Sequence, residues 1–324
     1  MPTTDSNTDG WRWESRPAKT QENLTTAERF RNLVSMRKRN GNKCVIFGLG
    51  QLGRDIATSF RASGWDVAGF TKLGCDITNH DQVIHTIKSE NPDLIVNCAA
   101  VHHLPQCETF PDASHLVNVS AAARIAFIAN AIGAPLVYIS TDQVFDGKKD
   151  SPYTEKDRCH PLNTYAKQKA WGEAASQGAA ELFIIRTGCL FGRDGSAQKG
   201  GNFITKLLSQ RRIVMTQRGR ISASYTKDLA DGIKELIRTA KPGIYHLANA
   251  GETSWYELAK YAIDRSGLPI ELIPTDEDPS GIPRPAYSVL DCSKAAAVGV
   301  LLPPWTSAVD RYLDEIRSVS PELL

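Results

Sequence analysis

The sequence predicts an α/β fold, a doubly wound parallel sheet followed by a smaller mixed α/β region. Short apolar runs alternate with amphipathic runs from residue 43 onward, which is typical of parallel strands covered by helices on both faces. A glycine-rich turn joins the first apolar run to the first amphipathic run. After Gly192 the alternation becomes irregular, so we expect a second region there.

Each expected strand and helix follows from its own run of residues. The apolar runs predict strands over 44–47, 66–70, 94–100, 136–140 and 182–186. The runs between them predict helices over 55–62, 82–89, 112–131 and 165–177. Gly64 is a natural stop for the first of these helices. In the second region we expect helices over 202–210, 227–239, 254–266 and 306–316, and a strand over 244–248.

The first 42 residues precede this alternation. Residues 1–24 are polar and rich in Thr, Asn, Asp and Ser, and we expect them to be disordered. Residues 25–42 predict an appended helix, because Thr25 can cap a helix that carries Glu28 three residues later. We interpret this extension as packing on the domain or on a partner. Acidic residues among its arginines argue against a transit peptide.

Composition excludes several classes of protein. The 324 residues carry a formal net charge of +2 and are 41% hydrophobic, unlike a strongly basic nucleic-acid binder. Seven scattered cysteines without a Cys-x-x-Cys pair predict reduced thiols and a cytoplasmic protein. His102 and His103 would point to opposite faces of an extended segment, so we expect no metal site. No apolar run approaches the ~20 residues of a membrane span, and we expect no membrane association.

The glycine-rich turn predicts a dinucleotide site. Gly48, Gly50 and Gly53 follow a strand and open a helix, with Gln51 and Leu52 between the last two. Such glycines permit a tight turn and let a pyrophosphate approach the amides of the helix N-terminus. A tight turn that serves packing alone is the other interpretation. The strand–turn–helix context favours the nucleotide, so we assign 43–192 to a Rossmann-type NAD(P)-binding domain and 193–324 mainly to substrate binding, interleaved with the sheet.

The end of the second strand favours NADPH. An acidic residue there would bind the ribose hydroxyls of NAD, but the sequence reads Phe70-Thr71-Lys72. Lys72, with Thr71 or Arg54, can bind a 2′-phosphate. We therefore predict NADPH as the cofactor and keep NADH as the alternative. A solvated Lys72 without any cofactor role is the competing interpretation.

Three residues predict hydride-transfer chemistry. Tyr165 and Lys169 are four apart and share one face of a predicted helix. A nearby ammonium lowers the pKa of a phenol, so Tyr165 can donate a proton to a carbonyl oxygen while Lys169 also holds the nicotinamide ribose. Thr141 ends the fourth strand and can hydrogen-bond the same oxygen. A surface helix pair and a turn residue are the alternatives, but the order of these residues after the glycine turn favours catalysis.

Longer stretches extend these matches over residues 43 to 316. They include Ser-Thr-Asp-x-Val-Phe-Asp-Gly over 140–147 and Pro-Leu-Asn-x-Tyr-x-Lys-x-Lys over 161–169. On these stretches the chain resembles the extended short-chain dehydrogenase/reductase family, and within it the dTDP-4-dehydrorhamnose reductase branch. The resemblance implies NADPH-dependent reduction of a 4-keto group on a nucleotide-linked deoxysugar. Thr141, Tyr165 and Lys169 match the catalytic positions of that branch.

The resemblance also implies binding residues. Asp76 and Ile77 match residues that flank the adenine, and Asn118 matches a helix residue near the active site. The cofactor contacts expected beyond the glycine turn are Thr71, Lys72, Asp76, Ile77, Cys98, Ala99, Ala100, Asn118, Ser140, Tyr165 and Lys169. For the nucleotide-sugar substrate we expect contacts from His102, Asn202 and Arg284. Magnesium-assisted dimers occur in the branch, so a homodimer is an expectation, although no residue pattern for that ion is present.

The sugar-facing positions depart from the branch. Gln143 stands where the branch usually has Tyr, and Cys189 replaces a Trp that would lie against the sugar. Residues 101–105 also differ, and the glycine turn is one residue shorter. We therefore expect an altered sugar nucleotide. Two alternatives remain on the same fold: a sugar-nucleotide epimerase or dehydratase, and a regulatory subunit like the β-subunit of methionine adenosyltransferase.

Overall fold

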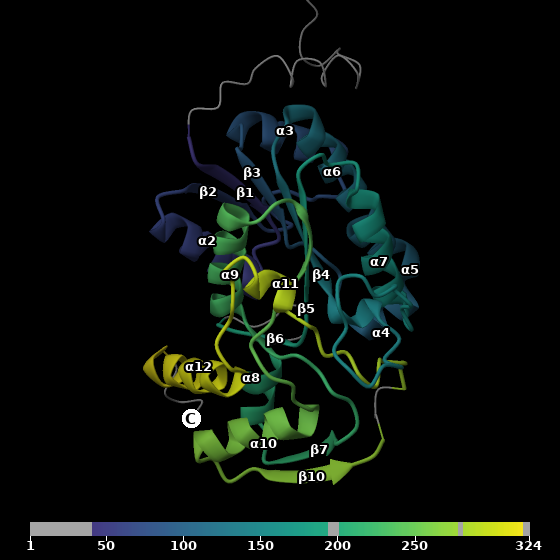
Figure 1. Cartoon of the computed structure of the whole chain (residues 1–324), viewed down its shortest axis with the longest axis vertical. Helices are drawn as coiled ribbons and strands as arrows, with labels where there is room; N and C mark the ends of the chain where they lie inside the picture. Colours follow the sequence, from purple (N-terminus) through teal and green to yellow (C-terminus); the bar gives the residue numbers. More distant parts are fainter. Residues whose placement is uncertain (1–40, 194–200, 278–280, 320–324) are drawn as a thin grey trace, which may run out of the picture. The chain divides into compact units, whose positions relative to one another are not determined.

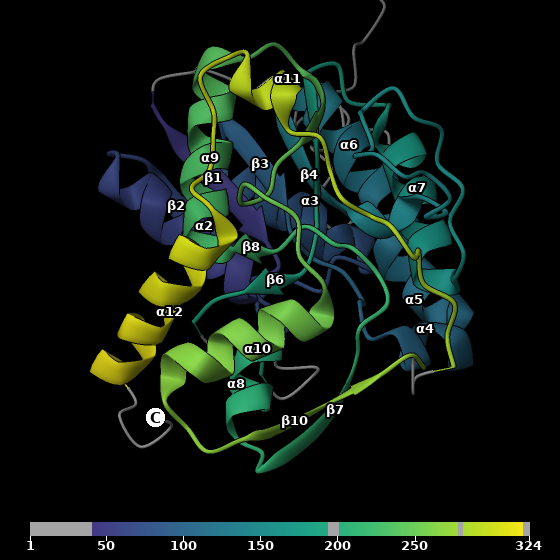
Figure 2. The same cartoon turned by 60° about the horizontal axis from the view of Figure 1, so that its bottom comes forward.

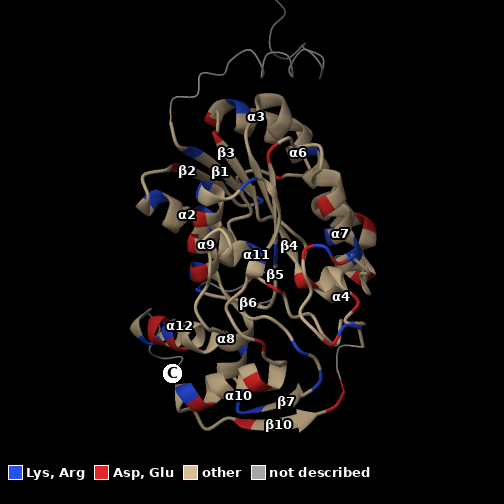
Figure 3. Ribbon diagram, in the orientation of Figure 1, with Lys and Arg blue, Asp and Glu red and all other residues tan. Residues whose placement is uncertain are grey.

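The structure is a computed structural model that describes residues 41–193, 201–277 and 281–319 (Figure 1). The predictions for 1–24 and for a helix within 25–42 fall almost entirely outside the described residues. Figure 3 shows Lys and Arg interspersed with Asp and Glu along the same elements.

A six-stranded parallel sheet forms the frame. Its order is β2-β1-β3-β4-β5-β9, and all five neighbouring pairs are parallel. The strands are β1 (Lys43–Phe47), β2 (Asp66–Phe70), β3 (Leu94–Asn97), β4 (Leu136–Thr141), β5 (Leu182–Thr187) and β9 (Gly243–His246). The order reverses between β1 and β3, and ligands bind doubly wound sheets at the carboxyl ends of such strands. The predicted fold class is confirmed.

Helices cover both faces of this sheet (Figure 1). On one face α2 (Gln51–Ala62) packs against α9 (Thr226–Thr239), while α3 (His80–Glu90), α6 (Ala121–Ile132) and α7 (Thr164–Ser176) cover the other. Burial follows the helical period: in α9, Leu229, Ile233 and Leu236 point into the core. All of these helices were predicted, with ends that differ by a few residues.

The long helix predicted over 112–131 is interrupted. It consists of α5 (Pro111–His115), a π-helical turn η2 (Leu116–Ser120) and α6. A π-turn adds a residue to the helical turn and is frequent at functional sites, and this one carries the buried Asn118. The stretch is long and apolar enough to cross a membrane by length and composition, but α6 packs on β3, β4 and α7 as a core helix does.

The region after β5 combines the predicted helices α8 (Phe203–Leu208), α10 (Trp255–Ser266) and α12 (Trp305–Val319) with short elements that the sequence did not predict. Two small parallel sheets pair β6 (Leu190–Phe191) with β8 (Ser224–Tyr225) and β7 (Arg212–Thr216) with β10 (Glu271–Thr275) (Figure 2). Around them lie these three helices and α11 (Ser293–Ala296). Runs of two to five residues give little periodic signal, which is why these strands and α11 were missed. Strand β3 also ends at Asn97 and not at residue 100, and α4 (Leu104–Thr109) follows it.

Candidate active site

The carboxyl end of β1 is shaped by glycines. Gly48 has a φ of 91°, and a Cβ there would lie 2.5 Å from the backbone nitrogen of Ala99. A Cβ on Gly53 would lie 2.2 Å from the carbonyl oxygen of Gly48. These two positions exclude any side chain, because overlaps with backbone atoms cannot be relieved by a rotamer change.

The same turn fits a dinucleotide. A Cβ on Gly50 would meet nothing within 4 Å, so the loop presents open backbone there. The helix α2 begins without a side-chain cap and without an acidic residue in its first turn, which suits a bound pyrophosphate. Gln51 donates weakly to the carbonyl of Leu190 at 3.4 Å, while its buried Oε1 atom has no partner among the described residues. A bound nucleotide can supply one.

The edge beyond β2 contains the predicted adenosine-binding residues. Asp76 Oδ1 accepts hydrogen bonds from the amide and hydroxyl of Thr78, and the Thr78 hydroxyl lowers the pKa of Asp76. Lys72 is 85% exposed, and its Nζ lies 3.9 Å from an Asp76 carboxylate oxygen. Thr71 is exposed beside it and Ile77 is buried. An exposed ion pair of this length is weak, so Lys72 can move to a phosphate.

At the carboxyl end of β4 two predicted catalytic hydroxyls come together. Thr141 ends the strand, is buried, and donates to Asp142 Oδ1 at 3.1 Å while accepting from the Gln143 amide at 3.2 Å. Tyr165 stands in the first turn of α7, which Asn163 caps through the Ala166 amide. Burial raises the pKa of Tyr165, and interaction with the Thr141 hydroxyl opposes that rise.

Lys169 lies one helical turn after Tyr165, but it has its own partners. Its buried Nζ donates to the hydroxyl of Tyr138 at 2.8 Å and to the carbonyl of Ile139 at 2.6 Å. Burial lowers the pKa of Lys169 to about 7, and the charge of Glu173 acts in the opposite direction. Lys169 therefore hydrogen-bonds a second tyrosine, Tyr138, and its effect on Tyr165 stays a prediction.

Tyr138 is a site residue that the sequence analysis missed. Its hydroxyl donates a hydrogen bond to the carbonyl of Asn118 at 3.3 Å and accepts one from Lys169 Nζ. A Cβ on Gly172 would lie 2.1 Å from that hydroxyl, so a glycine in α7 makes room for it. The available signal was one phenol inside an otherwise apolar strand, and pairing it with Lys169 required the tertiary structure.

Two predicted cofactor residues serve the protein itself. Ser140 donates to Glu173 Oε1 at 2.5 Å, and Glu173 also holds Arg186 at 2.7 Å. Asn118 exchanges hydrogen bonds of 2.9 Å with both backbone groups of Val101 and donates to Gln168. These hydrogen bonds fix α7 and the loop after β3, and the cofactor contacts expected from Ser140 and Asn118 stay a prediction. The backbone of Cys98 and Ala99 lies against Gly48 of the glycine turn, and the cofactor contacts expected from Cys98, Ala99 and Ala100 stay a prediction.

The three predicted substrate residues lie in different parts of the fold and differ in burial. Asn202 is buried and caps α8, with Oδ1 accepting from Thr205 and Nδ2 donating to the Gly192 carbonyl and the Tyr312 hydroxyl. The polar atoms of Asn202 are thus engaged within the protein, and its contact with the substrate stays a prediction. His102 is half-buried, 3.5 Å from the Ala100 carbonyl. Arg284 is exposed, next to Pro283, whose carbonyl accepts from Asn163 at 3.0 Å.

The departing residues border the catalytic end. Gln143 Oε1 accepts from Asn163 Nδ2 at 3.2 Å, so it is tied to the cap of the catalytic helix. Cys189 is partly buried, forms no disulfide and packs against the core of the second region. Among the described residues, no group of three His, Cys, Asp or Glu side chains is arranged to hold a metal ion.

Comparisons with known proteins agree with this geometry. A family model described as RmlD substrate binding domain matches residues 42–318. The spore coat polysaccharide biosynthesis protein SpsK of Bacillus subtilis is 36% identical over 286 residues, which cover 85% of this chain and 98% of that protein. The dTDP-4-dehydrorhamnose reductase of Escherichia coli is 33% identical, covering 84% and 97%. The crystal structure of dTDP-4-dehydrorhamnose reductase from Bacillus anthracis in complex with NADP superposes with a TM-score of 0.79 at 30% identity, covering 85% and 99%.

Proposed function

Because this chain belongs to the RmlD substrate binding domain family, we propose that Thr141, Tyr165 and Lys169 form its catalytic centre. The chain is an NADPH-dependent oxidoreductase that reduces the 4-keto group of a nucleotide-linked deoxysugar. The observation that carries the assignment of the centre is the meeting of Thr141 and Tyr165 at the carboxyl end of β4. Bound NADPH supplies the hydride.

Tyr165 is the proton donor. Burial and its raised pKa keep the phenol protonated at neutral pH, so it can donate to the keto oxygen when negative charge develops there. Thr141 places its oxygen beside the phenol and offers the keto oxygen a second hydrogen bond. The phenolate that remains after transfer recovers its proton from solvent before the next turnover.

Lys169 supplies positive charge at the centre. Its pKa of about 7 leaves the ammonium and the neutral amine both populated near neutral pH. The ammonium stabilises the phenolate form of Tyr165, and the Tyr138 hydroxyl at 2.8 Å holds it in the sheet-facing position. With NADPH bound, Lys169 would also hold the nicotinamide ribose.

The nucleotide lies along the ends of β1, β2 and β3. Gly48, Gly50 and Gly53 admit the pyrophosphate, and the α2 N-terminus with Gln51 and Leu52 surrounds it. Thr71 and Lys72 bind the 2′-phosphate at the exposed edge, with Asp76 and Ile77 beside the adenine. Support comes from the open backbone at Gly50 and from the exposure of Lys72.

The sugar nucleotide reaches Tyr165 from the side of the second region. Arg284 is exposed beside the cap of α7 and offers a cation to the diphosphate, and His102 of the loop after β3 is the second residue that we expect to contact the substrate. Gln143 and Cys189 replace larger aromatic residues of the branch, so the sugar accepted differs from that of the branch. None of the seven cysteines, all within the described residues, forms a disulfide, in keeping with a cytoplasmic location.

The decisive experiment follows the absorbance of NADPH with dTDP-4-dehydro-deoxysugars generated in situ, with NADH in parallel. We expect turnover with NADPH and a loss on the order of 10²–10⁴-fold in Tyr165→Phe. Undiminished turnover in Tyr165→Phe would exclude this mechanism. Sugar conversion without net NADPH consumption would indicate an epimerase or dehydratase, and cofactor binding without conversion of any keto-sugar would indicate a regulatory subunit.

A further inference from the structure

Asp142 is a buried acid that the mechanism above does not use. It follows Thr141 directly, is 5% exposed, and divides its carboxylate between two hydroxyls. Oδ1 accepts from Thr141 at 3.1 Å, and Oδ2 accepts from Ser288 at 2.6 Å. Ser288 is also buried and belongs to a distant part of the chain. One side chain therefore joins a catalytic hydroxyl to the second region.

Ser288 lies in residues 281–292, which we call the return segment. The segment passes the catalytic end of the sheet and is attached there at several points. Pro283 accepts from Asn163, and a Cβ on Gly147 would lie 2.4 Å from the Ala286 amide nitrogen. The backbone of Ser288 donates to the Arg220 carbonyl at 2.8 Å. The segment thus contacts the cap of α7 as well as the residue after Thr141.

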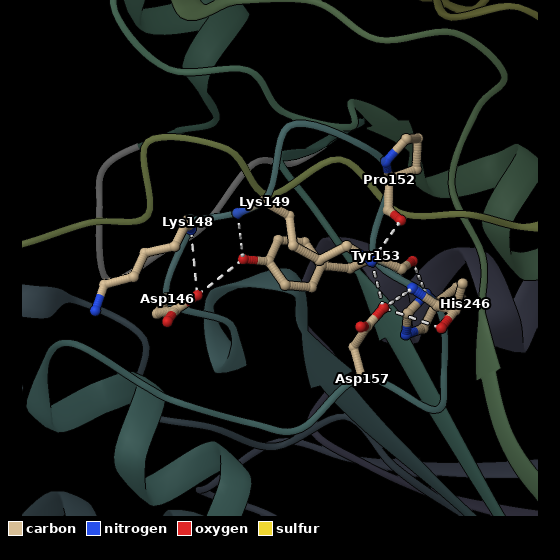
Figure 4. Close-up of polar contacts among 8 residues, drawn as sticks. Asp146, Lys148, Lys149, Pro152, Tyr153, Asp157 and His246 are labelled. Atoms are coloured by element: carbon tan, nitrogen blue, oxygen red, sulfur yellow. Dashed lines mark hydrogen bonds and ion pairs between the residues drawn. The ribbon is translucent and has the colours of Figure 1, made fainter.

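A second anchor holds the far end of the segment. Tyr153 donates its amide to Val289 and accepts from the Asp291 amide, both at 2.8 Å. Figure 4 shows Tyr153 fixed in turn, with its hydroxyl on Asp146 Oδ1 at 2.9 Å and its carbonyl 3.0 Å from His246 Nδ1. Anchored on both sides, the Ser288 hydroxyl has little freedom to leave Asp142.

Besides the Ser288 and Thr141 hydroxyls, the backbone amides of Asp142 and Gln143 interact with the carboxylate of Asp142. A Cβ on Gly188 would lie 3.1 Å from Asp142 Oδ2 and 2.5 Å from the Ser222 carbonyl, so the residue that follows β5 packs over that oxygen. Tyr165 of α7 is the described titratable group whose pKa responds to the charge of Asp142. An ionised carboxylate only accepts hydrogen bonds, so it draws the Thr141 proton toward itself.

In this geometry Asp142 and the keto oxygen of the substrate compete for the single hydroxyl proton of Thr141. Thr141 has one proton, and that proton is directed to Asp142 before substrate arrives. To donate to a keto oxygen, the hydroxyl must turn away from the carboxylate. Asp142 then keeps the Ser288 hydroxyl as its side-chain donor. Without Ser288 the desolvated carboxylate has one donor fewer and would hold the Thr141 proton more strongly, because each donor lost to a buried charge is costly.

We infer that Asp142 is a positioning residue that sets the direction of the Thr141 hydroxyl, and that Ser288 of the return segment controls how readily that hydroxyl turns to the substrate. The inference rests on the proposed catalytic role of Thr141. The hydrogen bond from Ser288 to Asp142 thereby links the second region to the orientation of the Thr141 hydroxyl.

The test is a double-mutant cycle between Ser288→Ala and Thr141→Val. We expect Ser288→Ala to lower kcat about tenfold, the size of one hydrogen bond to a charged group, with the Kd for NADPH unchanged. In the Thr141→Val background the same substitution should leave kcat unchanged, whereas in Thr141→Ser, which keeps a hydroxyl, it should again lower kcat. Equal losses with and without the Thr141 hydroxyl would overturn the inference, because a purely structural effect is additive.

Two controls keep the outcomes separate. Ser176→Ala removes another fully buried hydroxyl, which donates to Gly172 at the far end of α7, and should alter stability without altering kcat. If Ser288→Ala does not fold, Asp142→Asn must change kcat in the wild-type background and leave it unchanged in Thr141→Val. If Thr141→Val itself keeps full kcat, the role of Thr141 fails and the inference fails with it. A slow Thr141→Val beside an unaffected Ser288→Ala overturns the inference alone.

Discussion

The carboxyl ends of β1 and β4 lie at the same edge of one sheet, but their candidate sites are built in different ways. At β1 the site is made by missing side chains, since Gly48 and Gly53 leave no room for a Cβ against neighbouring backbone. At β4 the site is made by polar side chains, since Thr141, Lys169 and Tyr138 are buried and hydrogen-bonded. The first end should therefore fail when atoms are added, and the second when polar atoms are removed.

The largest effect is expected from adding one methyl group at β1. Gly48→Ala places a Cβ 2.5 Å from the Ala99 nitrogen at a φ of 91°, so we expect a loss of about 3 kcal/mol or more in the free energy of unfolding. Gly50→Ala is the matched control, because its Cβ enters open space. It should keep the stability and weaken NADPH binding. Thermal unfolding and NADPH titration measure both, and similar stability losses in the two variants would contradict the steric account.

The next effect tests the charge at β4. Lys169 is charged below its pKa of about 7, which burial has lowered, so the ammonium fraction falls as pH rises through that value. If the ammonium is the active form, kcat/KM should fall with it. Lys169→Met should lose on the order of 10²-fold in kcat/KM and lack this step in its pH profile. A wild-type profile that stays flat across this range would remove Lys169 as the charge that matters.

A smaller effect separates Tyr138 from other tyrosines. Tyr138→Phe removes the hydroxyl that accepts a hydrogen bond from Lys169 Nζ and donates one to the Asn118 carbonyl. We expect roughly a tenfold lower kcat and about 1–2 kcal/mol less stability, the loss of one hydrogen bond to a charged group. Tyr245→Phe removes a hydroxyl bonded to the Lys241 carbonyl and should change stability alone. Equal kcat values in the two variants would show that Tyr138 only packs.

The smallest effect is expected at the exposed edge of the nucleotide site. Lys72→Ala removes a side chain whose Nζ is 3.9 Å from Asp76 and largely exposed. Exposed charge pairs contribute roughly 0–1 kcal/mol, so we expect up to about a fivefold loss in the preference for NADPH over NADH. Steady-state assays with both cofactors measure the preference. An unchanged ratio would assign the 2′-phosphate to other residues, with Lys72 a solvated lysine.

The sequence by itself determined the parallel sheet, most helices, the glycine turn and the family. Each of these depends on neighbours along the chain, such as the strand–turn–helix run at Gly48 or the four-residue spacing of Tyr165 and Lys169. Local spacing also placed Asn202 at a helix start, although its polar atoms proved to serve the cap.

Only the tertiary structure decided which polar groups meet. Ser288 lies 146 residues from Asp142, Tyr138 lies 31 residues from Lys169, and no periodicity reports such pairings. The short strands of the second region were likewise decided by their partners, because two-residue runs such as β6 and β8 are stable only when paired. Hydrogen bonds between distant side chains depend on how the whole chain packs, and a motif records only its own part of that packing.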